Sequence, residues 1–210
     1  PAPNRPPRSA MNILVILSHP RPGSFNHALA ETARSALRHD GHAVMFHDLY
    51  AEGLTLLPAG EAPSSAPIPP AIQAHVNELL AADGIVIIHP NWLGQPPAIL
   101  KGWIDRVIRP GVAYCFKEGD GGEGVPAGLL RARAAVVLNT SNTPDEREQR
   151  VFGDPLEAIW KRCIFDLCGV QNVHRRLFNV VVTSTPEQRQ AWLVEAAALC
   201  RTAFSFLPPD

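Results

Sequence analysis

The chain has 210 residues, of which 46% are hydrophobic and 19% are charged, a composition typical of a globular protein. Its formal net charge of -1 gives no overall positive field that would hold nucleic acid or an anionic lipid surface. The four cysteines form no CxxC pair, and the longest apolar run is far too short to span a membrane. We therefore expect a cytoplasmic protein with reduced thiols, no nucleic-acid partner and no integral membrane segment.

The first ten residues contain four prolines and no large apolar side chain, which predicts a disordered tail at 1–10 followed by a single domain at 11–210. An apolar run at 13–17 predicts the first strand, and a polar loop follows it at 18–26. After this loop, apolar residues recur at helical spacing and predict the first helix; they are Leu29, Ala33, Ala36 and Leu37.

The same alternation continues to the end of the chain. Further strands are predicted at 43–49, 84–89, 134–138 and 173–182, and further helices at 70–82, 98–108, 155–168 and 186–204. Stretches rich in proline or glycine predict loops at 54–69 and 117–128. Strands that are apolar on both faces need cover on both sides, so the pattern predicts an α/β fold with a doubly wound, five-stranded parallel sheet and helices on both faces.

Three helix starts carry a capping signal of their own. In each of them a Thr or Asp precedes a first-turn proline, and Glu or Gln follows at the third position; they begin at Thr143, Asp154 and Thr185. We expect each of these three side chains to cap its helix.

Ligands of an open parallel sheet lie beyond the carboxyl ends of its strands, so the loops after the first, third and fourth strands should form the site. The first loop ends in Ser24, Phe25 and Asn26 at a helix start, where free backbone N–H groups favour a phosphate. Taken alone, the loop is better explained by Ser24 or Asn26 capping the helix and Phe25 anchoring the core than by ligand binding. It lacks the GxGxxG spacing of a dinucleotide-binding loop, and His19 has no second metal ligand nearby, so no metal site is expected.

The loop after the third strand runs from Pro90 to Pro97 and contains the indole of Trp92 together with a glycine and several prolines. A helix that contains Trp103 follows it. Exposed backbone amides in such a loop can meet the polar edge of a flat heteroaromatic ring, while Trp92 or Leu93 covers its face. For Trp103, packing is the simpler explanation. Asn139 and the run from Thr140 to Thr143 add small polar groups at the same sheet edge.

Three segments resemble the NAD(P)H:quinone dehydrogenase family, which has a flavodoxin-like fold. They are SHPRPGSFNHALAE (18–31), HPNWLGQPPAILKGWIDRV (89–107) and GVAYCF (111–116), of which the part PPAILKGWIDRV is the most specific. The resemblance runs from about Asn12 to Cys200. It implies a homodimer with two flavin sites at the subunit interface, a non-covalent FAD or FMN, and ping-pong hydride transfer from NADPH or NADH to quinone-like acceptors.

The resemblance also assigns roles to individual residues. It implies that the phosphate side of the flavin meets His19, Phe25 and Asn26, and that the isoalloxazine meets Asn91, Trp92, Leu93 and Gly94, next to Pro90. The hydroxyl of Ser24 can add a further donor at the phosphate, as its place in the loop already indicates. The ring edge would meet Thr140, Ser141, Asn142 and Thr143, and the acceptor pocket would contain Tyr114 and Phe116. The dimer would also cover apolar surface of the helix at 98–108.

The sequence departs from the family at three places. Leu93 stands where relatives commonly have an aromatic residue, and the run 140–143 replaces a Thr-Thr-Gly-Gly loop. The tyrosine and histidine that hydrogen-bond the reduced flavin in relatives have no counterpart between Asp145 and Phe152, so no catalytic residue is assigned.

Three functions other than that of a flavin oxidoreductase fit the sequence to different degrees. A flavin-binding regulatory or accessory subunit of a membrane transporter, with the same fold, is compatible with the sequence. A one-electron flavodoxin fits less well because such carriers are strongly acidic. A hydrolase is disfavoured because the sequence has neither a GxSxG motif nor a metal-ligand cluster.

Overall fold

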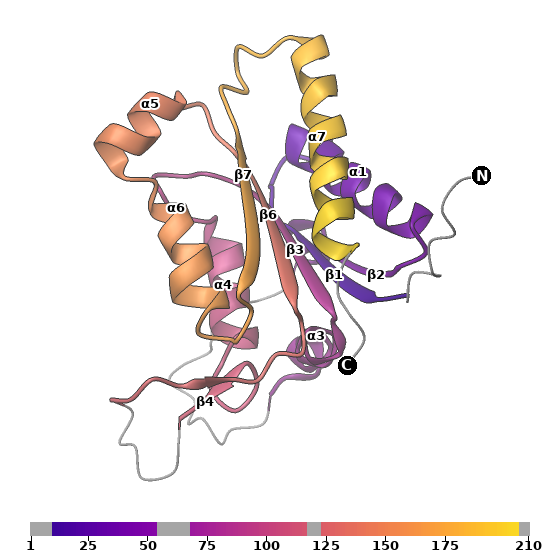
Figure 1. Cartoon of the computed structure of the whole chain (residues 1–210), viewed down its shortest axis with the longest axis vertical. Coiled ribbons are helices and arrows are strands. Elements are labelled where there is room, and N and C mark those ends of the chain that lie inside the picture. Colours follow the sequence, from indigo (N-terminus) through magenta and orange to yellow (C-terminus); the bar gives the residue numbers. More distant parts are fainter. Residues whose placement is uncertain (1–9, 54–67, 117–122, 206–210) are drawn as a thin grey trace, which may run out of the picture.

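The structure is a computed structural model, and it describes residues 10–53, 68–116 and 123–205 (Figure 1). Nearly all of the predicted tail and most of the two predicted loops at 54–69 and 117–128 lie outside the described residues. Among the described helices, none combines the length and the apolar character that a membrane span requires. All four cysteines are free thiols.

The core of the fold is a parallel sheet of five strands in the order β2-β1-β3-β6-β7. The strands are β1 (Asn12–Leu17), β2 (Ala43–Asp48), β3 (Gly84–Pro90), β6 (Ala134–Thr140) and β7 (Asn172–Phe178). Every residue of β3 and β6 is buried, because helices cover both faces of the central strands. The predicted doubly wound parallel sheet is thus confirmed, and its order is that of flavodoxin-like folds.

Helices α1 (Phe25–His39) and α7 (Pro186–Phe204) cover one face of the sheet, and α3 (Pro70–Ala81), α4 (Ala98–Val107) and α6 (Pro155–Ala158) lie on the other (Figure 1). Short helical segments follow β2 directly and β6 after a four-residue loop. They are α2 (Leu49–Glu52), α5 (Asp145–Arg147) and the π-helical segment η1 (Glu148–Phe152).

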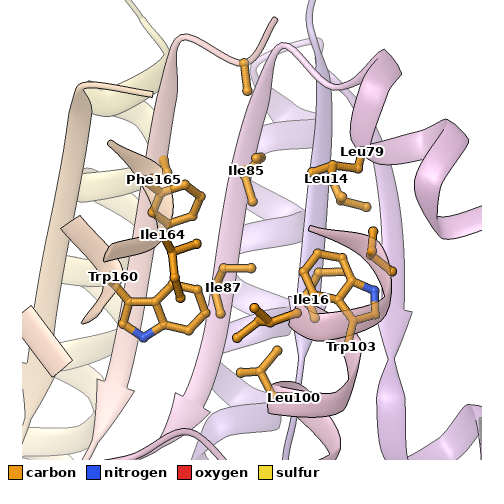
Figure 2. Packing of buried hydrophobic residues seen from close by; sticks show 14 of the residues in the cluster. Leu14, Ile16, Leu79, Ile85, Ile87, Leu100, Trp103, Trp160, Ile164 and Phe165 are labelled. Atoms are coloured by element: carbon orange, nitrogen blue, oxygen red, sulfur yellow. The ribbon is translucent and has the colours of Figure 1, made fainter. Parts of the chain in front are cut away.

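The predicted helix at 155–168 is one helical turn, α6, that continues as the π-helical segment η2 (Ile159–Phe165). The wider π turn brings Trp160, Ile164 and Phe165 onto one side, where they pack on the sheet (Figure 2). Trp103 from α4 enters the same cluster and is fully buried, which confirms that it is a packing residue.

Helix α4 buries its large apolar side chains within its own chain, including Leu100, Trp103 and Val107. Its outer surface carries Lys101 and Asp105, which form an ion pair. The expectation that this helix leaves apolar surface for a partner is therefore wrong, because its apolar stripe faces the sheet.

Among the strand boundaries that differ from the prediction, the ends of β2 and β7 have a physical reason. Strand β2 ends at Asp48, because the carboxylate of this residue caps α2 through the N–H groups of Tyr50 and Ala51. Strand β7 ends at Phe178 rather than at residue 182. Its partner β6 ends at Thr140, so the ladder has no strand to continue along.

Only one of the three predicted caps forms. Thr185 accepts from the N–H of Gln188 at 3.2 Å, as expected. Thr143 does not cap, because the helix begins after Pro144. Asp154 precedes α6, but its carboxylate binds the guanidinium of Arg175 at 2.7 Å instead of the helix N–H groups. The charged partner, distant in sequence, outcompetes the local cap.

Candidate functional site

Three loops meet at the carboxyl edge of the sheet. Ser18, directly after β1, donates its backbone N–H to Ile88 at the end of β3, and Asn91 N–H donates to the carbonyl of Thr140 at the end of β6. Strand β1 lies between β2 and β3, so this edge contains the point where the strand order reverses. The loops that the sequence selected therefore lie together at the expected place.

A buried side-chain bond joins the first and third loops. The Nδ2 of Asn26, at the start of α1, donates to the Thr140 hydroxyl at 2.9 Å. Asn26 Oδ1 and the hydroxyl of Ser18 are buried without a partner among the described residues. The Thr140 hydroxyl can donate or accept, so turning the amide by 180° keeps the bond and frees Nδ2 to donate to a ligand. A bound cofactor would supply the hydrogen-bond partner that these buried polar atoms lack.

The start of α1 is free of side-chain capping. Ser24 is the N-cap residue, but its hydroxyl lies 2.8 Å from His27 Nδ1, and His27 Nε2 lies 3.2 Å from Asp48. The interpretation of Ser24 or Asn26 as a capping side chain is therefore wrong. The backbone N–H groups of His27 and Ala28 donate to the carbonyl of Ser24, so those of Phe25 and Asn26 are the first-turn donors that can meet an anion.

The ring of Phe25 lies 5.8 Å from that of Trp192 and 6.3 Å from that of Phe178, between centroids. Its side chain therefore anchors α1 to the core. Only the backbone of Phe25 can meet a phosphate.

His19 is half-buried beside the same helix start. Its Nδ1 accepts from the backbone N–H of Arg21 at 3.1 Å, so in the neutral ring Nε2 carries the proton and can donate. Burial is the largest cause that lowers the pKa of His19, which favours this neutral form.

The loop after β3 forms a tight turn from Trp92 to Gln95, whose backbones exchange hydrogen bonds of 3.0 Å in both directions. The two central residues, Leu93 and Gly94, have φ of 55° and 75°, the left-handed pair of a type I′ turn. A Cβ on Gly94 would lie 2.7 Å from Pro155, so no other residue fits there. Leu93 is fully exposed.

A fully buried polar network lies beneath this loop. His89 Nδ1 donates to the carbonyl of Pro90 at 2.8 Å, and Nε2 accepts from Trp160 and Asn139, each at 2.9 Å. Asn139 in turn accepts from Arg175 at 2.7 Å. Burial, assisted by Arg175, lowers the pKa of His89 to about 4, so the ring is neutral and its tautomer is fixed. No local sequence pattern indicates a role for His89, Trp160 or Arg175, because these partners are far apart in the chain.

The run after β6 is largely used within the protein. The Ser141 hydroxyl accepts from Thr143 N–H at 3.0 Å, and Asn142 Oδ1 accepts from Val182 N–H at 2.9 Å. The carbonyl of Thr143 accepts from Asn179. Of the four predicted side chains, only that of Thr140 bonds to the start of α1.

Tyr114 and Phe116 do not lie at this edge. Tyr114 belongs to β4 (Tyr114–Cys115), which pairs with β5 (Ala127–Gly128) shortly before β6 begins. The hairpin is therefore at the amino edge of the sheet, at the lower end of the view, far from α5 (Figure 1). A seven-residue strand such as β6 is about 20 Å long, and this length separates the hairpin from the three loops.

One group among the described residues brings metal-ligand atoms within 4.8 Å of one another, namely His47, Glu52 and His75. The indole N–H of Trp103 donates to His75 Nδ1 at 3.2 Å, so Nε2 carries the proton and faces Glu52 at 3.4 Å. Metal binding through Nε2 would place a proton on Nδ1, against the indole N–H. The group fits a cluster of polar contacts better than a metal centre.

A surface hollow of about 420 Å³ lies between α1 and α7, away from the three loops. It is lined by Glu31, Thr32, Ser35, Ala36, His39, Ala197 and Arg201. It contains none of the residues that converge at the carboxyl edge of the sheet, so it does not bear on a cofactor.

A family model described as having a flavodoxin-like fold matches residues 11–201. The chain belongs to this flavodoxin-like family. It is 32% identical over 193 residues to an uncharacterized NAD(P)H oxidoreductase of Haemophilus influenzae, with 90% of this chain and 93% of the relative covered. It is also 32% identical to NAD(P)H dehydrogenase (quinone) 1 of Rattus norvegicus, with 84% and 71% covered. These relatives confirm the resemblance to the NAD(P)H:quinone dehydrogenases.

Two further comparisons support membership of the flavodoxin-like family. An FMN-dependent NADH:quinone oxidoreductase of Ruegeria pomeroyi is 30% identical, with 77% of this chain and 85% of the relative covered. The crystal structure of Smu.1420 from Streptococcus mutans has a TM-score of 0.79 at 26% identity and covers 91% of this chain and all of its own.

Proposed function

We propose that this protein is a flavin-dependent NAD(P)H oxidoreductase that passes electrons to quinone-like acceptors by a ping-pong mechanism. The observation that carries the proposal is the convergence of the α1 start, the tight turn at 92–95 and Thr140 at one edge of the sheet. The names of the relatives supply the donor, NADH or NADPH, and the acceptor class. FMN or FAD would serve as cofactor, and the Ruegeria pomeroyi relative is an FMN-dependent enzyme.

The residues at this edge divide into a phosphate side and a ring side. The N–H groups at the start of α1, the Asn26 amide and the Nε2–H of His19 would hold the flavin phosphate, because all of them can donate to an anion. Asn91, Trp92, Leu93 and Gly94 would hold the ring, next to Pro90. When bound, the flavin supplies the hydride chemistry, and the protein supplies position and electrostatics.

We also propose that the working unit is a homodimer. Tyr114 and Phe116 lie about one strand length from the flavin loops of their own chain, so they can line an acceptor pocket only for a second copy. The hairpin region exposes Phe116, Val125 and Leu129, and the opposite edge exposes Leu93, Val151 and Phe152. Each apolar set would contact the other set across a two-fold axis. The four free cysteines fit a reducing compartment such as the cytoplasm.

The test is a flavin titration followed by reduction. The purified protein should bind FMN or FAD, show the visible absorption bands of a flavin, and lose them promptly on addition of NADH or NADPH under anaerobic conditions. A quinone should then restore the colour. Binding with very slow bleaching would favour the regulatory or accessory subunit instead, and no binding of either flavin would refute the proposal.

A further inference from the structure

Glu148 is a buried carboxylate beside the tight turn, and the proposed function does not use it. The residue is 1% exposed, and its Oε1 accepts from Asn91 Nδ2 at 2.9 Å. Glu146, two residues earlier, is by contrast at the surface, where it pairs with Arg150. Burying a carboxylate is unfavourable unless it is hydrogen-bonded. The hydrogen bond from Asn91 therefore offsets a substantial part of the cost of burying Glu148.

Asn91 transmits this contact to the turn. Its Oδ1 accepts from Gly94 N–H at 2.9 Å while its Nδ2 donates to Glu148. Glu148 Oε1 accepts and a backbone N–H can only donate, so the two partners fix the orientation of the amide. Glu148 therefore determines which side-chain atom Asn91 presents to the backbone of the turn.

The turn needs such support. Leu93 has a φ of 55°, which is unfavourable for a leucine, and its side chain is fully exposed, so packing does not compensate. The Asn91 bond to Gly94 and the contact of Gly94 with Pro155 hold the turn from the side of η1 and α6.

We propose that Glu148 is a positioning residue for the flavin-ring loop. Through Asn91 it holds residues 92–95 in the conformation in which their backbone meets the ring. The proposal rests on the proposed function, because it assumes that this loop holds the ring.

The experiment measures flavin affinity, by fluorescence quenching, and the kcat and KM for NAD(P)H in the full-length protein. E148A removes the acceptor for Asn91, so flavin binding should weaken roughly tenfold to a hundredfold. E148Q retains a side-chain oxygen that accepts from Asn91, so its affinity should stay within about threefold of the parent. E146A removes an exposed carboxylate from the same segment and should leave both measurements unchanged.

A double-mutant cycle separates this role from a general structural one. If Glu148 acts through Asn91, E148A should change the affinity less than about twofold in an N91A background. N91D places two carboxylates face to face and should weaken binding. E148Q should rescue N91D, because the introduced amide can donate to the new carboxylate. This rescue keeps the proposal testable even if E148A does not fold.

Parental affinity in E148A, an equally large effect of E148A in the N91A background, or failure of E148Q to rescue N91D would each overturn the role of Glu148. Absence of flavin binding in the parent itself would instead overturn the proposed function, so the two failures are distinguishable.

Discussion

Acidification from about pH 7 to about pH 5 should destabilise the protein through His89. The imidazole is fully buried, and burial lowers its pKa to about 4, whereas an unfolded histidine titrates near 6.5. Between these values the unfolded chain binds a proton that the folded chain does not. The stabilisation is therefore complete above about pH 6.5 and is lost progressively as the pH falls toward 4.

The size of the effect follows from the two pKa values. At pH 5 the unfolded histidine is almost fully protonated and the folded one is not, which lowers the free energy of unfolding by about 2 kcal/mol relative to pH 7. His75, whose pKa burial also lowers to about 4, adds to the same trend. The carboxylates of the protein also change the free energy of unfolding over this pH range. The contribution of His89 must therefore be isolated by comparing the parent with a variant that lacks this histidine.

The variant H89Q isolates it. A glutamine oxygen can accept from Trp160 and Asn139 as Nε2 does, but it does not titrate. Urea unfolding of the flavin-free protein at both pH values should show an acid-induced loss that is smaller by about 2 kcal/mol in H89Q than in the parent. H39Q, at the exposed end of α1, is the matched control. An equal loss in H89Q and the parent would refute the argument from burial.

Three further outcomes are expected. N26A should weaken flavin binding about tenfold to a hundredfold, because it removes an amide that would donate to the phosphate; unchanged affinity would leave Asn26 only its bond to Thr140. Light scattering should give twice the 22.8 kDa of one chain, and F116A should raise the KM for quinone with flavin content unchanged; a fully active monomer would contradict the shared pocket. G128A should lower the free energy of unfolding by about 3 kcal/mol or more, since its Cβ would lie 2.2 Å from backbone atoms of Cys168 and Gly169; chemical denaturation measures this, and G53A, whose Cβ meets no atom within 4 Å but whose φ of 60° is strained for alanine, should cost less.

The sheet could be predicted because its strands are continuous apolar runs, such as 84–89, whose composition already requires cover on both faces. The loops of the site followed from the same reasoning, since parallel strands end at one edge. Details that depend on distant partners could not be predicted. The local signal at Asp154 favours a helix cap, but Arg175 arrives from β7 and takes the carboxylate. The place of Tyr114, by contrast, follows from chain order, because a segment between a helix and the next parallel strand lies at the amino edge of the sheet.

The residues that the sequence did not single out share one property, which is that they act on the ring loop from outside it. His89 holds the Pro90 carbonyl from beneath, through a network that reaches Arg175 on β7, and Glu148 holds Asn91 from the side. The two supports meet at Asp154, whose carboxylate binds Arg175 and whose backbone N–H donates to the carbonyl of Glu148, so loss of one should weaken the other. A loop held in this way loses little conformational freedom when a ligand binds, which raises affinity for a flat ring without any added contact. The strained Leu93 at its tip is then tolerable, because the supports fix the backbone on either side of it.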